Sequence, residues 1–587
     1  MTSRIRRGSL RRRTVGAPST SSVPCAAACA NSPSPPALAA PLRDRGEAGM
    51  PVARATNGYG AAPGRRARLV AVAAEPEDLT PGSLRGLAGV ADELEVRADL
   101  VGDPDPSRLR RHFGGQLTYC LRSARQGGRS VAGPVERRTR LLRAADHYEL
   151  VDLEAMDDVQ QELLAAVPAR RRRVSWHASG HAGRAEGRCR AGLREAAGRL
   201  RERFAAMSAV PAALYLLAPP AGEGQYGFAA PLLLTGLGRT DVTAFASGPV
   251  GMWTRVLAPW LGAPVVFGRV GAQGEDGMPS VGRLLADYGL PALPPLSGLF
   301  GIAGRAPGGS LSPRLHNAAL RELRLPALYL PFQVDRFSRF WQWGFDFGAL
   351  AGIPLHGLTV TAPHKESALH VADVADPEAL GCGSANLLWL DQGRWRAATT
   401  DAVGALRPLA LGGVDPSGRT AAVIGCGGAG RAVAWALREA GARVTLVNRG
   451  IAHGLEASSR LGLPYIPLSR FSPAGYDLLV HATPLVEREP FPVAAADRDA
   501  VVLEMAYRDP PTALARATRA RGLVGIDGWQ VLFVEVREQF RLMTGHPMPD
   551  ALPLRSICSG SAEQAAVHDL TASGGPARAH RTGREAP

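Results

Sequence analysis

Short apolar runs alternate with longer amphipathic stretches over residues 66–288. Each run has the length of a buried strand, and each following stretch carries apolar residues at helical spacing. Eight repeats of this pattern in one stretch predict a (β/α)8 barrel, similar to the TIM barrel. The runs are ARLVAVAA (67–74), ELEVRADL (93–100), QLTYCLR (116–122), YELVDLE (148–154), RRVSWHA (172–178), AALYLLA (212–218), DVTAFAS (241–247) and APVVFG (263–268).

A second α/β unit follows the Pro- and Gly-rich linker GLPALPPLSG at 289–298 and extends over residues 299–556. Its middle contains RTAAVIGCGGAGRAVAWALREAGARVTLVNRG at 419–450, which predicts strand, glycine turn, helix and strand in that order. This order is typical of a Rossmann dinucleotide-binding domain.

The glycine turn carries the fingerprint Gly425-x-Gly427-x-x-Gly430. The first glycine permits the tight turn, the second lets a pyrophosphate approach the backbone, and the third lets helix and strand pack closely. At the end of the next strand stand Asn448 and Arg449, where enzymes that use NAD usually have Asp or Glu. Arginine is a permanent cation suited to a 2′-phosphate, so we expect NADP. The residues expected to contact the cofactor here are Gly425, Cys426, Gly427, Gly428, Ala429, Gly430, Asn448 and Arg449.

Lys365 is the only lysine among 587 residues, and the other 67 of the 68 Lys and Arg residues are arginines. A nicotinamide cofactor implies hydride transfer, and the substrate oxygen then needs a partner that exchanges its proton. A lysine can exchange a proton near neutral pH when it is buried or close to cations, whereas arginine stays charged. We therefore predict a catalytic role for Lys365 rather than a chance survivor of a compositional bias.

The formal net charge of +15 does not predict nucleic-acid binding, because basic residues cluster at the N-terminus and at 169–174 without interleaved aromatics. The seven cysteines show no CxxC pair and no metal-ligand spacing, so no metal is expected. No run is long enough to span a membrane. We expect a cytoplasmic protein. The alternative is organelle targeting through the Arg- and Ser-rich N-terminus.

Several motifs in order between Gly298 and about Pro549 resemble the shikimate dehydrogenases. The resemblance implies that Lys365 and Asp401 form the catalytic pair for NADPH-dependent reduction of 3-dehydroshikimate. It also implies a set of ligands for the substrate, namely Ser310, Ser312, Thr361, Asn386, Tyr507 and Glu535. Near the nicotinamide it places Thr483, Met505 and Gly528. The motifs are GIAGRAPGGSLSPRLHNAAL (301–320), GLTVTAPHKE (357–366), GSANLL (383–388), ATTDAVG (398–404), HATP (481–484), LEMAYRDPPTAL (503–514) and DGWQVLFVEVREQFRLMTG (527–545).

The match departs from the family pattern at a few positions. Thr359 and Thr399 stand where asparagines are usual, and His481 replaces the asparagine before ATP. Gly450 replaces a Thr or Ser. Glu535 stands where the family has a substrate-binding glutamine, and an ionised glutamate accepts hydrogen bonds without donating any. This leaves quinate and aminoshikimate open as rival substrates.

The N-terminal half resembles type I 3-dehydroquinate dehydratases over about 66–290. The matching polar residues occur in ELEVRADL, YCLRSARQGG, VSWHAS and SGPVGMWTR, and they are Glu95, Arg97, Arg122, His177 and Arg255. Those enzymes work through a lysine Schiff base, but Leu216 stands on the matching strand and no lysine exists in this half. We therefore doubt dehydratase activity and expect a barrel that binds a related acid or serves as a scaffold.

These observations predict a shikimate dehydrogenase of aromatic amino acid biosynthesis fused to a degenerate barrel. The alternatives are a bifunctional dehydratase and dehydrogenase, a quinate or aminoshikimate dehydrogenase, or a non-catalytic sensor of pathway metabolites. The expected organisation is a disordered tail at 1–65, the barrel at 66–290, a substrate-binding domain at 298–405, the NADP-binding domain at 406–526, a helical return to the substrate domain at 527–556 and a disordered tail at 557–587.

Overall fold

The computed structural model describes residues 66–178, 189–221, 227–271 and 277–558. The tail expected at 1–65 lies outside these residues. So does the tail expected from 557 onward, except that Ile557 and Cys558 complete helix α19 (Leu554–Cys558).

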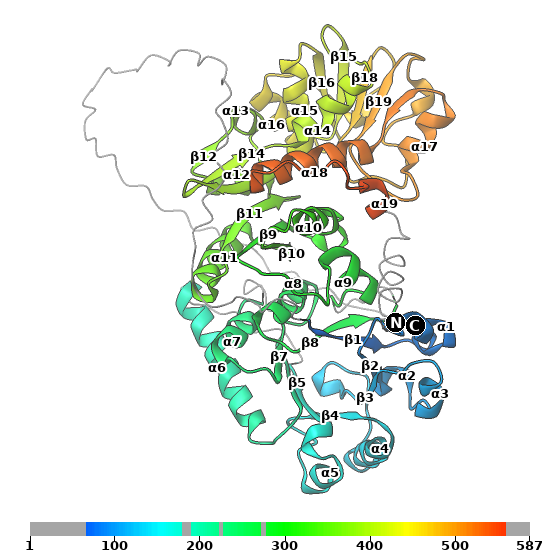
Figure 1. Ribbon diagram of the computed structural model, residues 1–587. Helices are drawn as coiled ribbons and strands as arrows, with labels where there is room; N and C mark the ends of the chain where they lie inside the picture. The colour runs from blue at the N-terminus through cyan, green and yellow to red at the C-terminus, as the bar shows by residue number, and fades with distance from the viewer. Residues whose placement is uncertain (1–65, 179–188, 222–226, 272–276, 559–587) are drawn as a thin grey trace, which may run out of the picture. The chain divides into compact units, whose positions relative to one another are not determined.

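Eight parallel strands form the N-terminal half, coloured blue to green in Figure 1. The pairing order is β7-β6-β5-β4-β3-β2-β1-β8, so the sheet curls into a barrel that is closed except between β7 and β8. Each strand lies within one of the eight predicted apolar runs, except that β8 extends one residue further to Arg269, and the prediction of a barrel is confirmed. The strands are β1 (Arg68–Ala73), β2 (Glu93–Arg97), β3 (Gln116–Cys120), β4 (Leu150–Glu154), β5 (Arg172–His177), β6 (Leu214–Ala218), β7 (Val242–Ala244) and β8 (Val265–Arg269).

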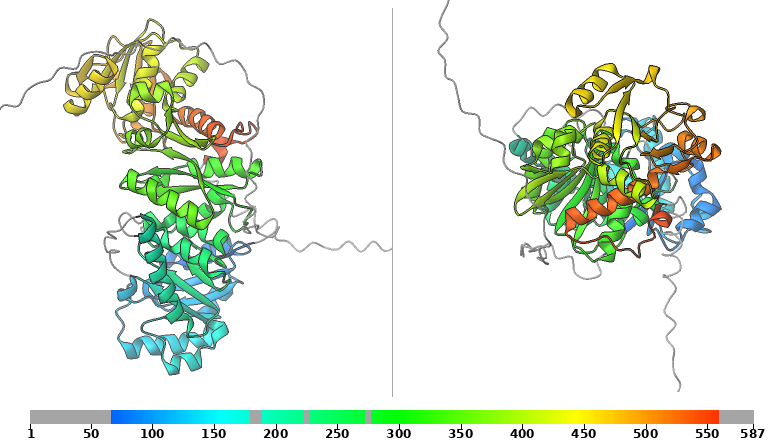
Figure 2. Two further views of the ribbon diagram at one scale, coloured as in Figure 1. Left: turned by 90° about the vertical axis from the view of Figure 1, so that its left-hand side faces the viewer. Right: turned by 90° about the horizontal axis from the view of Figure 1, so that it is seen from above.

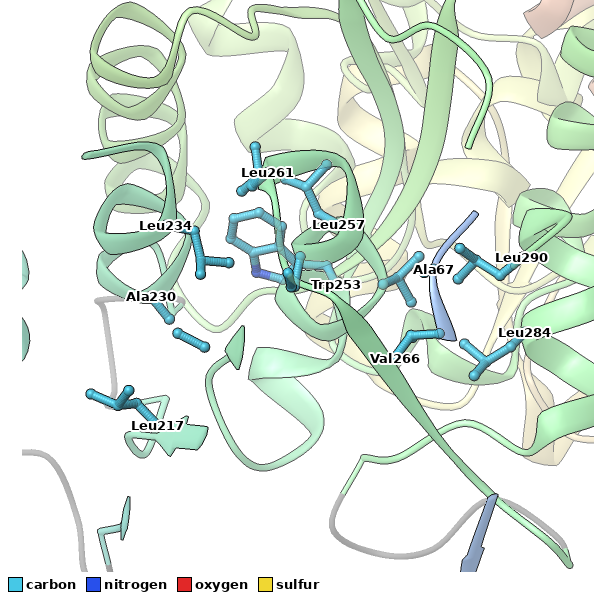
Figure 3. Packing of buried hydrophobic residues seen from close by; sticks show 14 of the residues in the cluster. Ala67, Leu217, Ala230, Leu234, Trp253, Leu257, Leu261, Val266, Leu284 and Leu290 are labelled. Atoms are coloured by element: carbon cyan, nitrogen blue, oxygen red, sulfur yellow. The ribbon is translucent and has the colours of Figure 1, made fainter. Parts of the chain in front are cut away.

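Alternate residues of these strands face opposite sides, as the period of two requires. Leu217 of β6 and Val266 of β8 pack outward against helices, together with Trp253 of α8 (Met252–Leu257) and Leu284 of α9 (Val281–Tyr288). Figure 3 shows this layer. The flanking strand residues, such as Leu216, pack with one another in a separate apolar cluster inside the barrel.

The second sheet has six strands in the order β10-β9-β11-β13-β14-β12. Strand β9 pairs in parallel with β10 and β11, whereas β13 runs antiparallel to both β11 and β14. The strands are β9 (Gly298–Gly304), β10 (Ala327–Gln333), β11 (Leu355–Val360), β12 (Val374–Ala375), β13 (Leu387–Asp391) and β14 (Arg394–Ala398). Helix α18 (Gly528–Thr544) packs on this sheet through residues such as Val536 and Phe540, far along the chain from the strands it covers.

The third sheet is wholly parallel, with the order β17-β16-β15-β18-β19-β20. It has apolar clusters on both faces, one formed with helices α14, α15 and α16 and the other with α17 (Figures 1 and 2). The order reverses at β15, and ligands of such sheets bind at this switch point. The strands are β15 (Thr420–Ile424), β16 (Arg443–Asn448), β17 (Tyr465–Pro467), β18 (Leu478–His481), β19 (Val501–Glu504) and β20 (Val524–Ile526), and the helices are α14 (Asp401–Leu411), α15 (Gly428–Glu439), α16 (Ile451–Leu461) and α17 (Ala513–Ala520).

Candidate active site

One cavity of about 430 Å³ gathers residues from distant parts of the C-terminal unit. Its walls come from the ends of β9 and β11, the starts of α10 (Ser312–Glu322), α12 (Lys365–Val371) and α14, and one face of α18. The structure brings to this cavity all the residues expected to bind or transform a substrate, namely Ser310, Ser312, Thr361, Lys365, Asn386, Asp401, Tyr507 and Glu535.

Lys365 and Asp401 form an ion pair at the cavity wall. The Lys365 Nζ donates to both carboxylate oxygens of Asp401 at 2.7 Å. Each residue is the first of its helix, and the helix N-terminus stabilises the Asp401 carboxylate. Thr399 donates a further hydrogen bond to Asp401 Oδ2 at 3.3 Å. A threonine at this position therefore orients the carboxylate, which explains how the site accommodates a departure from the family pattern.

The opposite side of the cavity carries hydroxyl groups. Ser310 Oγ donates to Ser312 Oγ at 3.2 Å and accepts from the Ser312 backbone N–H at 3.1 Å. Tyr507 is hydrogen-bonded to Ser310, and burial raises the pKa of its phenol, so it stays neutral. Thr359 is hydrogen-bonded to the Tyr329 hydroxyl on the sheet side. Neutral donors close together in a partly buried wall suit a carboxylate ligand.

Asn386 is held by a network that the sequence analysis did not identify. Its Oδ1 accepts from the Thr400 backbone N–H at 2.7 Å, and its Nδ2 donates to Thr400 Oγ1 at 3.0 Å. Gln539 Nε2 also donates to Thr400 Oγ1, at 2.9 Å. Gln539 follows Glu535 by four residues, so the two share a helix face, and this spacing is the signal that would have identified it.

Glu535 projects from α18 beside the N-terminal turn of α14. A Cβ atom at Gly404 would lie 2.6 Å from Glu535 Cγ, so glycine makes room for this side chain. Removal from water raises the pKa of Glu535 well above its ordinary value, and the negative charge of Asp401 raises it further. The positive charge of Lys365 opposes these effects less strongly.

The glycine fingerprint lies at the switch point of the parallel sheet, between β15 and α15. Gly425 has φ +115°, and a Cβ at Gly430 would collide with the Gly425 carbonyl oxygen. A Cβ at Gly427 would meet no atom within 4 Å. The first and third glycines therefore serve the turn and its packing, whereas the second leaves space above the start of the helix. This cradle fits the pyrophosphate of a dinucleotide.

Gly428 connects the two parts of the site. A Cβ at this position would lie 2.9 Å from Lys365 Cδ, so the cofactor helix begins directly beside the lysine side chain. Arg431, on the first turn of α15, donates to Glu366 at 2.6 Å and to the Cys382 carbonyl at 3.0 Å. Ser384 donates to the Gly428 carbonyl at 3.0 Å. The fingerprint and the lysine are recognisable in the sequence, but these contacts between them are not.

Strand β16 ends beside the fingerprint. Asn448 Oδ1 accepts from the Cys426 N–H at 3.3 Å, and its Nδ2 donates to the Gly450 carbonyl at 2.8 Å. Arg449 is exposed next to it. The asparagine therefore shapes the end of the strand, and the guanidinium of Arg449 remains accessible to a phosphate.

The residues expected near the nicotinamide lie at the ends of neighbouring strands. Thr483 follows β18, and its methyl group would lie 2.8 Å from a Cβ at Gly425. Met505 follows β19. Gly528 is the first residue of α18, and a side chain at this position would collide with the Ala506 carbonyl oxygen. His481 contacts Thr483 Oγ1 through Nε2 at 2.5 Å, so it holds the threonine in place.

Four of the polar residues expected in the barrel lie on or directly after β2, β3 and β5, and Arg255 lies on α8. Arg97 forms a bidentate pair with Asp99 at 2.8 and 2.9 Å, and Arg122 lies 4.0 Å from Glu95. Burial and the charges of four arginines, Arg255 among them, hold the pKa of His177 well below its ordinary range. The imidazole is therefore neutral within a positive cluster.

The barrel interior is divided into a charged part and an apolar part. Buried Arg173 on β5 donates to Asp152 at 2.7 Å and to Glu95 at 2.8 Å. On the neighbouring strand β6, Leu214 and Leu216 belong to the interior apolar cluster. Neither inward position offers a nucleophile.

No group of three or more potential metal-ligating side chains occurs in the described residues. Within the same ranges, no helix has the length and apolar character that a membrane crossing requires. The cavity and the glycine turn together combine an ion pair, neutral hydroxyls and a dinucleotide cradle. These features define the class of two-domain α/β dehydrogenases.

Comparisons with known proteins narrow this class. The type I 3-dehydroquinase family matches residues 70–291, and the shikimate dehydrogenase substrate-binding domain matches residues 302–388. A shikimate dehydrogenase (NADP(+)) of Thermococcus kodakarensis is 32% identical over 272 residues, which are 45% of this chain and 97% of the relative. One from Rubrobacter xylanophilus is 35% identical over 278 residues, 45% of this chain and 95% of the relative. The chain belongs to the shikimate dehydrogenase family, and a type I 3-dehydroquinase domain precedes the matching part.

A relative with both parts is the chloroplastic bifunctional 3-dehydroquinate dehydratase/shikimate dehydrogenase of Arabidopsis thaliana. It is 28% identical over 344 residues. This match covers 54% of the present chain and 56% of that relative. Among solved structures, a shikimate 5-dehydrogenase from Thermus thermophilus in complex with NADP(H) and shikimate is 30% identical, with a TM-score of 0.39 over 46% of this chain and 99% of that one.

Proposed function

We propose that this chain catalyses the reversible NADP-dependent oxidation of shikimate to 3-dehydroshikimate. The observation that carries the proposal is the position of the one lysine, whose Nζ pairs with Asp401 at 2.7 Å while its side chain passes beside the first residue of the cofactor helix. A proton-exchanging group thus lies where a substrate ring would meet a nicotinamide. The curated relatives named as NADP(+) shikimate dehydrogenases support this choice of substrate and cofactor.

The residues of the site divide the work between binding and proton transfer. Ser310, Ser312 and Tyr507 bind the substrate carboxylate through neutral donors. Lys365 Nζ takes the proton from the ring hydroxyl during oxidation and returns it during reduction, and Asp401 holds the ammonium in position. Asn386, fixed by Thr400, orients a second ring hydroxyl.

NADP, when bound, accepts or supplies the hydride at its nicotinamide ring. Gly427 leaves room for the pyrophosphate at the N-terminus of α15, where the backbone N–H groups and the helix dipole favour anions. Arg449 binds the 2′-phosphate. Thr483 and Met505 would line the nicotinamide ring.

Steady-state reduction of NADP tests the proposal. Shikimate, quinate and aminoshikimate are compared as substrates, with NAD in place of NADP as the cofactor control. We expect shikimate with NADP to have the highest kcat/KM. Turnover of none of the three compounds would refute dehydrogenase activity and favour a non-catalytic sensor, and a preference for quinate or aminoshikimate would correct the substrate.

We further propose that the barrel does not form a Schiff base. The support is chemical, because an imine requires an amine and the barrel half contains no lysine. Leu214 and Leu216 fill the inward positions of β6, next to Arg173 and Ser175 in the β5 register. The positive surroundings of His177 suit a non-covalent complex with an anionic acid.

Borohydride trapping tests the second proposal on the full chain. The protein is incubated with 3-dehydroquinate and borohydride, and peptide mapping locates any irreversible mass addition. A type I dehydroquinase that has the lysine serves as the positive control. We expect no addition to peptides from residues 66–290, and an addition there would refute the proposal.

A further inference from the structure

Glu535 has no internal partner for its carboxyl group. It lines the substrate cavity from α18, and no hydrogen bond from any described residue reaches its oxygens. Gln539, one turn further along the same helix face, is by contrast engaged with Thr400. Glu535 is half-buried, so its carboxyl group is open to the cavity and within reach of a ligand there.

The charges around Glu535 are unfavourable to a second carboxylate. From α14, Asp401 is already ionised and paired with Lys365 of α12, whose ammonium gives both of its 2.7 Å bonds to that one carboxylate. Tyr507, after β19, is neutral because burial raises its pKa. On α10, His316 lies buried near Gln539, and burial lowers its pKa to about 3, so it contributes no positive charge.

No other titratable group enters from the described elements that line this cavity. Arg537 and Glu538 of α18 pair away from the cavity, with Asp550 and Arg541. Among the described residues that line the cavity, the cation near Glu535 is therefore Lys365, and its charge is balanced by Asp401. Ionising Glu535 would leave a net negative charge in a cavity that has to accept an anionic substrate.

We propose that Glu535 binds the substrate as a neutral carboxylic acid that donates a hydrogen bond to a ring hydroxyl, and that its ionisation sets an upper pH limit on substrate binding. This deepens the proposed function and rests on it. A protonated carboxyl has one donor and one free acceptor, the same pattern as the glutamine that the family usually has at this position. The residue thus serves polyhydroxylated ring acids rather than ring amines.

The sign of the pH effect follows from the raised pKa of Glu535. Below that pKa the carboxyl is protonated and donates. Above it the group is anionic, loses its donor and repels the substrate carboxylate within the same cavity. Substrate affinity therefore falls as the pH rises through the pKa of Glu535.

The test compares wild type with E535Q, whose amide donates at every pH, and with E538Q as a matched control on the same helix. As the pH rises through the pKa of Glu535, we expect the wild-type KM for shikimate to rise about tenfold and that of E535Q to change less than about twofold. E538Q should follow wild type. An E535Q profile that matches wild type would overturn the proposal.

Aminoshikimate, which carries an amine, tests whether Glu535 is ionised instead of neutral. Its use as a substrate is compared with that of shikimate in wild type and E535Q. If Glu535 were ionised at neutral pH, wild type would favour aminoshikimate over shikimate and E535Q would reverse this preference, which would also overturn the proposal.

Infrared difference spectra separate this proposal from the proposed function. Ligand-free wild type minus E535Q should show the carbonyl stretch of a protonated carboxylic acid at neutral pH, which disappears as the pH rises. This readout does not depend on turnover. Absence of the band would overturn the proposal even in an active enzyme, whereas a lack of shikimate turnover with the band present would refute only the proposed function.

Discussion

The barrel and the C-terminal unit both contain ion pairs between cationic side chains and carboxylates, but they use different cations. In the barrel, Arg97 and Arg173 are paired with carboxylates, and no side chain can exchange a proton as an amine does. In the C-terminal unit, one lysine pairs with one aspartate beside a dinucleotide cradle. Permanent cations bind and orient, whereas a titratable amine also performs proton transfer. On this difference rest our two proposals, which assign redox chemistry to the C-terminal unit and at most non-covalent binding to the barrel.

Replacement of Lys365 tests whether the amine of the C-terminal unit transfers the proton, and it has the largest expected effect. Lys365→Arg keeps a positive charge beside Asp401 but replaces the amine by a guanidinium, which does not exchange protons in proteins. We expect kcat for shikimate oxidation to fall by about 10³-fold, the range of a lost general base. NADPH affinity, measured by fluorescence titration, should change little. Undiminished turnover would contradict the assignment.

Arg449→Ala tests the cation expected to bind the 2′-phosphate. Loss of a charge-assisted contact to phosphate should raise the KM for NADP by about 10- to 100-fold, because such contacts contribute about 1.5 to 3 kcal/mol. The KM for NAD should stay within about twofold, since NAD has no 2′-phosphate. Steady-state kinetics with both cofactors measure the ratio. An equal effect on both would show that Arg449 does not discriminate between them.

The smallest effect is expected from the barrel. Arg122→Ala and His177→Ala remove two of its charged or polar side chains without touching the C-terminal cavity. We expect kcat/KM for shikimate to stay within about twofold of wild type, as for distant independent sites. Circular dichroism confirms that the variants are folded. A loss larger than tenfold in a folded variant would show that the barrel participates in the dehydrogenase reaction.

The barrel and the parallel cofactor sheet could be predicted from the sequence because their strands are buried on both faces and appear as continuous apolar runs. The runs around Leu69, Leu153 and Val423 are examples. Lys365 and the glycine fingerprint were also visible, the first by its rarity and the second by its spacing.

Other parts of the site could not be predicted, because they depend on contacts between distant segments. Gly428 is the third of four glycines in its turn, and only the structure shows that Lys365 fills the space its side chain would need. Thr400 and Gln539 are 139 residues apart and meet only after α18 packs against α14. The lack of a partner for Glu535 likewise follows from the packing around it.

The most direct test of the division between the two units is NADPH consumption by the full chain with each of two substrates. With 3-dehydroshikimate and NADPH, we predict steady oxidation of NADPH. With 3-dehydroquinate and NADPH, we predict none until a separate dehydroquinase is added, which should restore it. Formation of shikimate from 3-dehydroquinate and NADPH alone would contradict the account, because it would require the barrel to perform a dehydration without an amine. Formation of quinate would instead show direct reduction of the 3-ketone by the C-terminal unit.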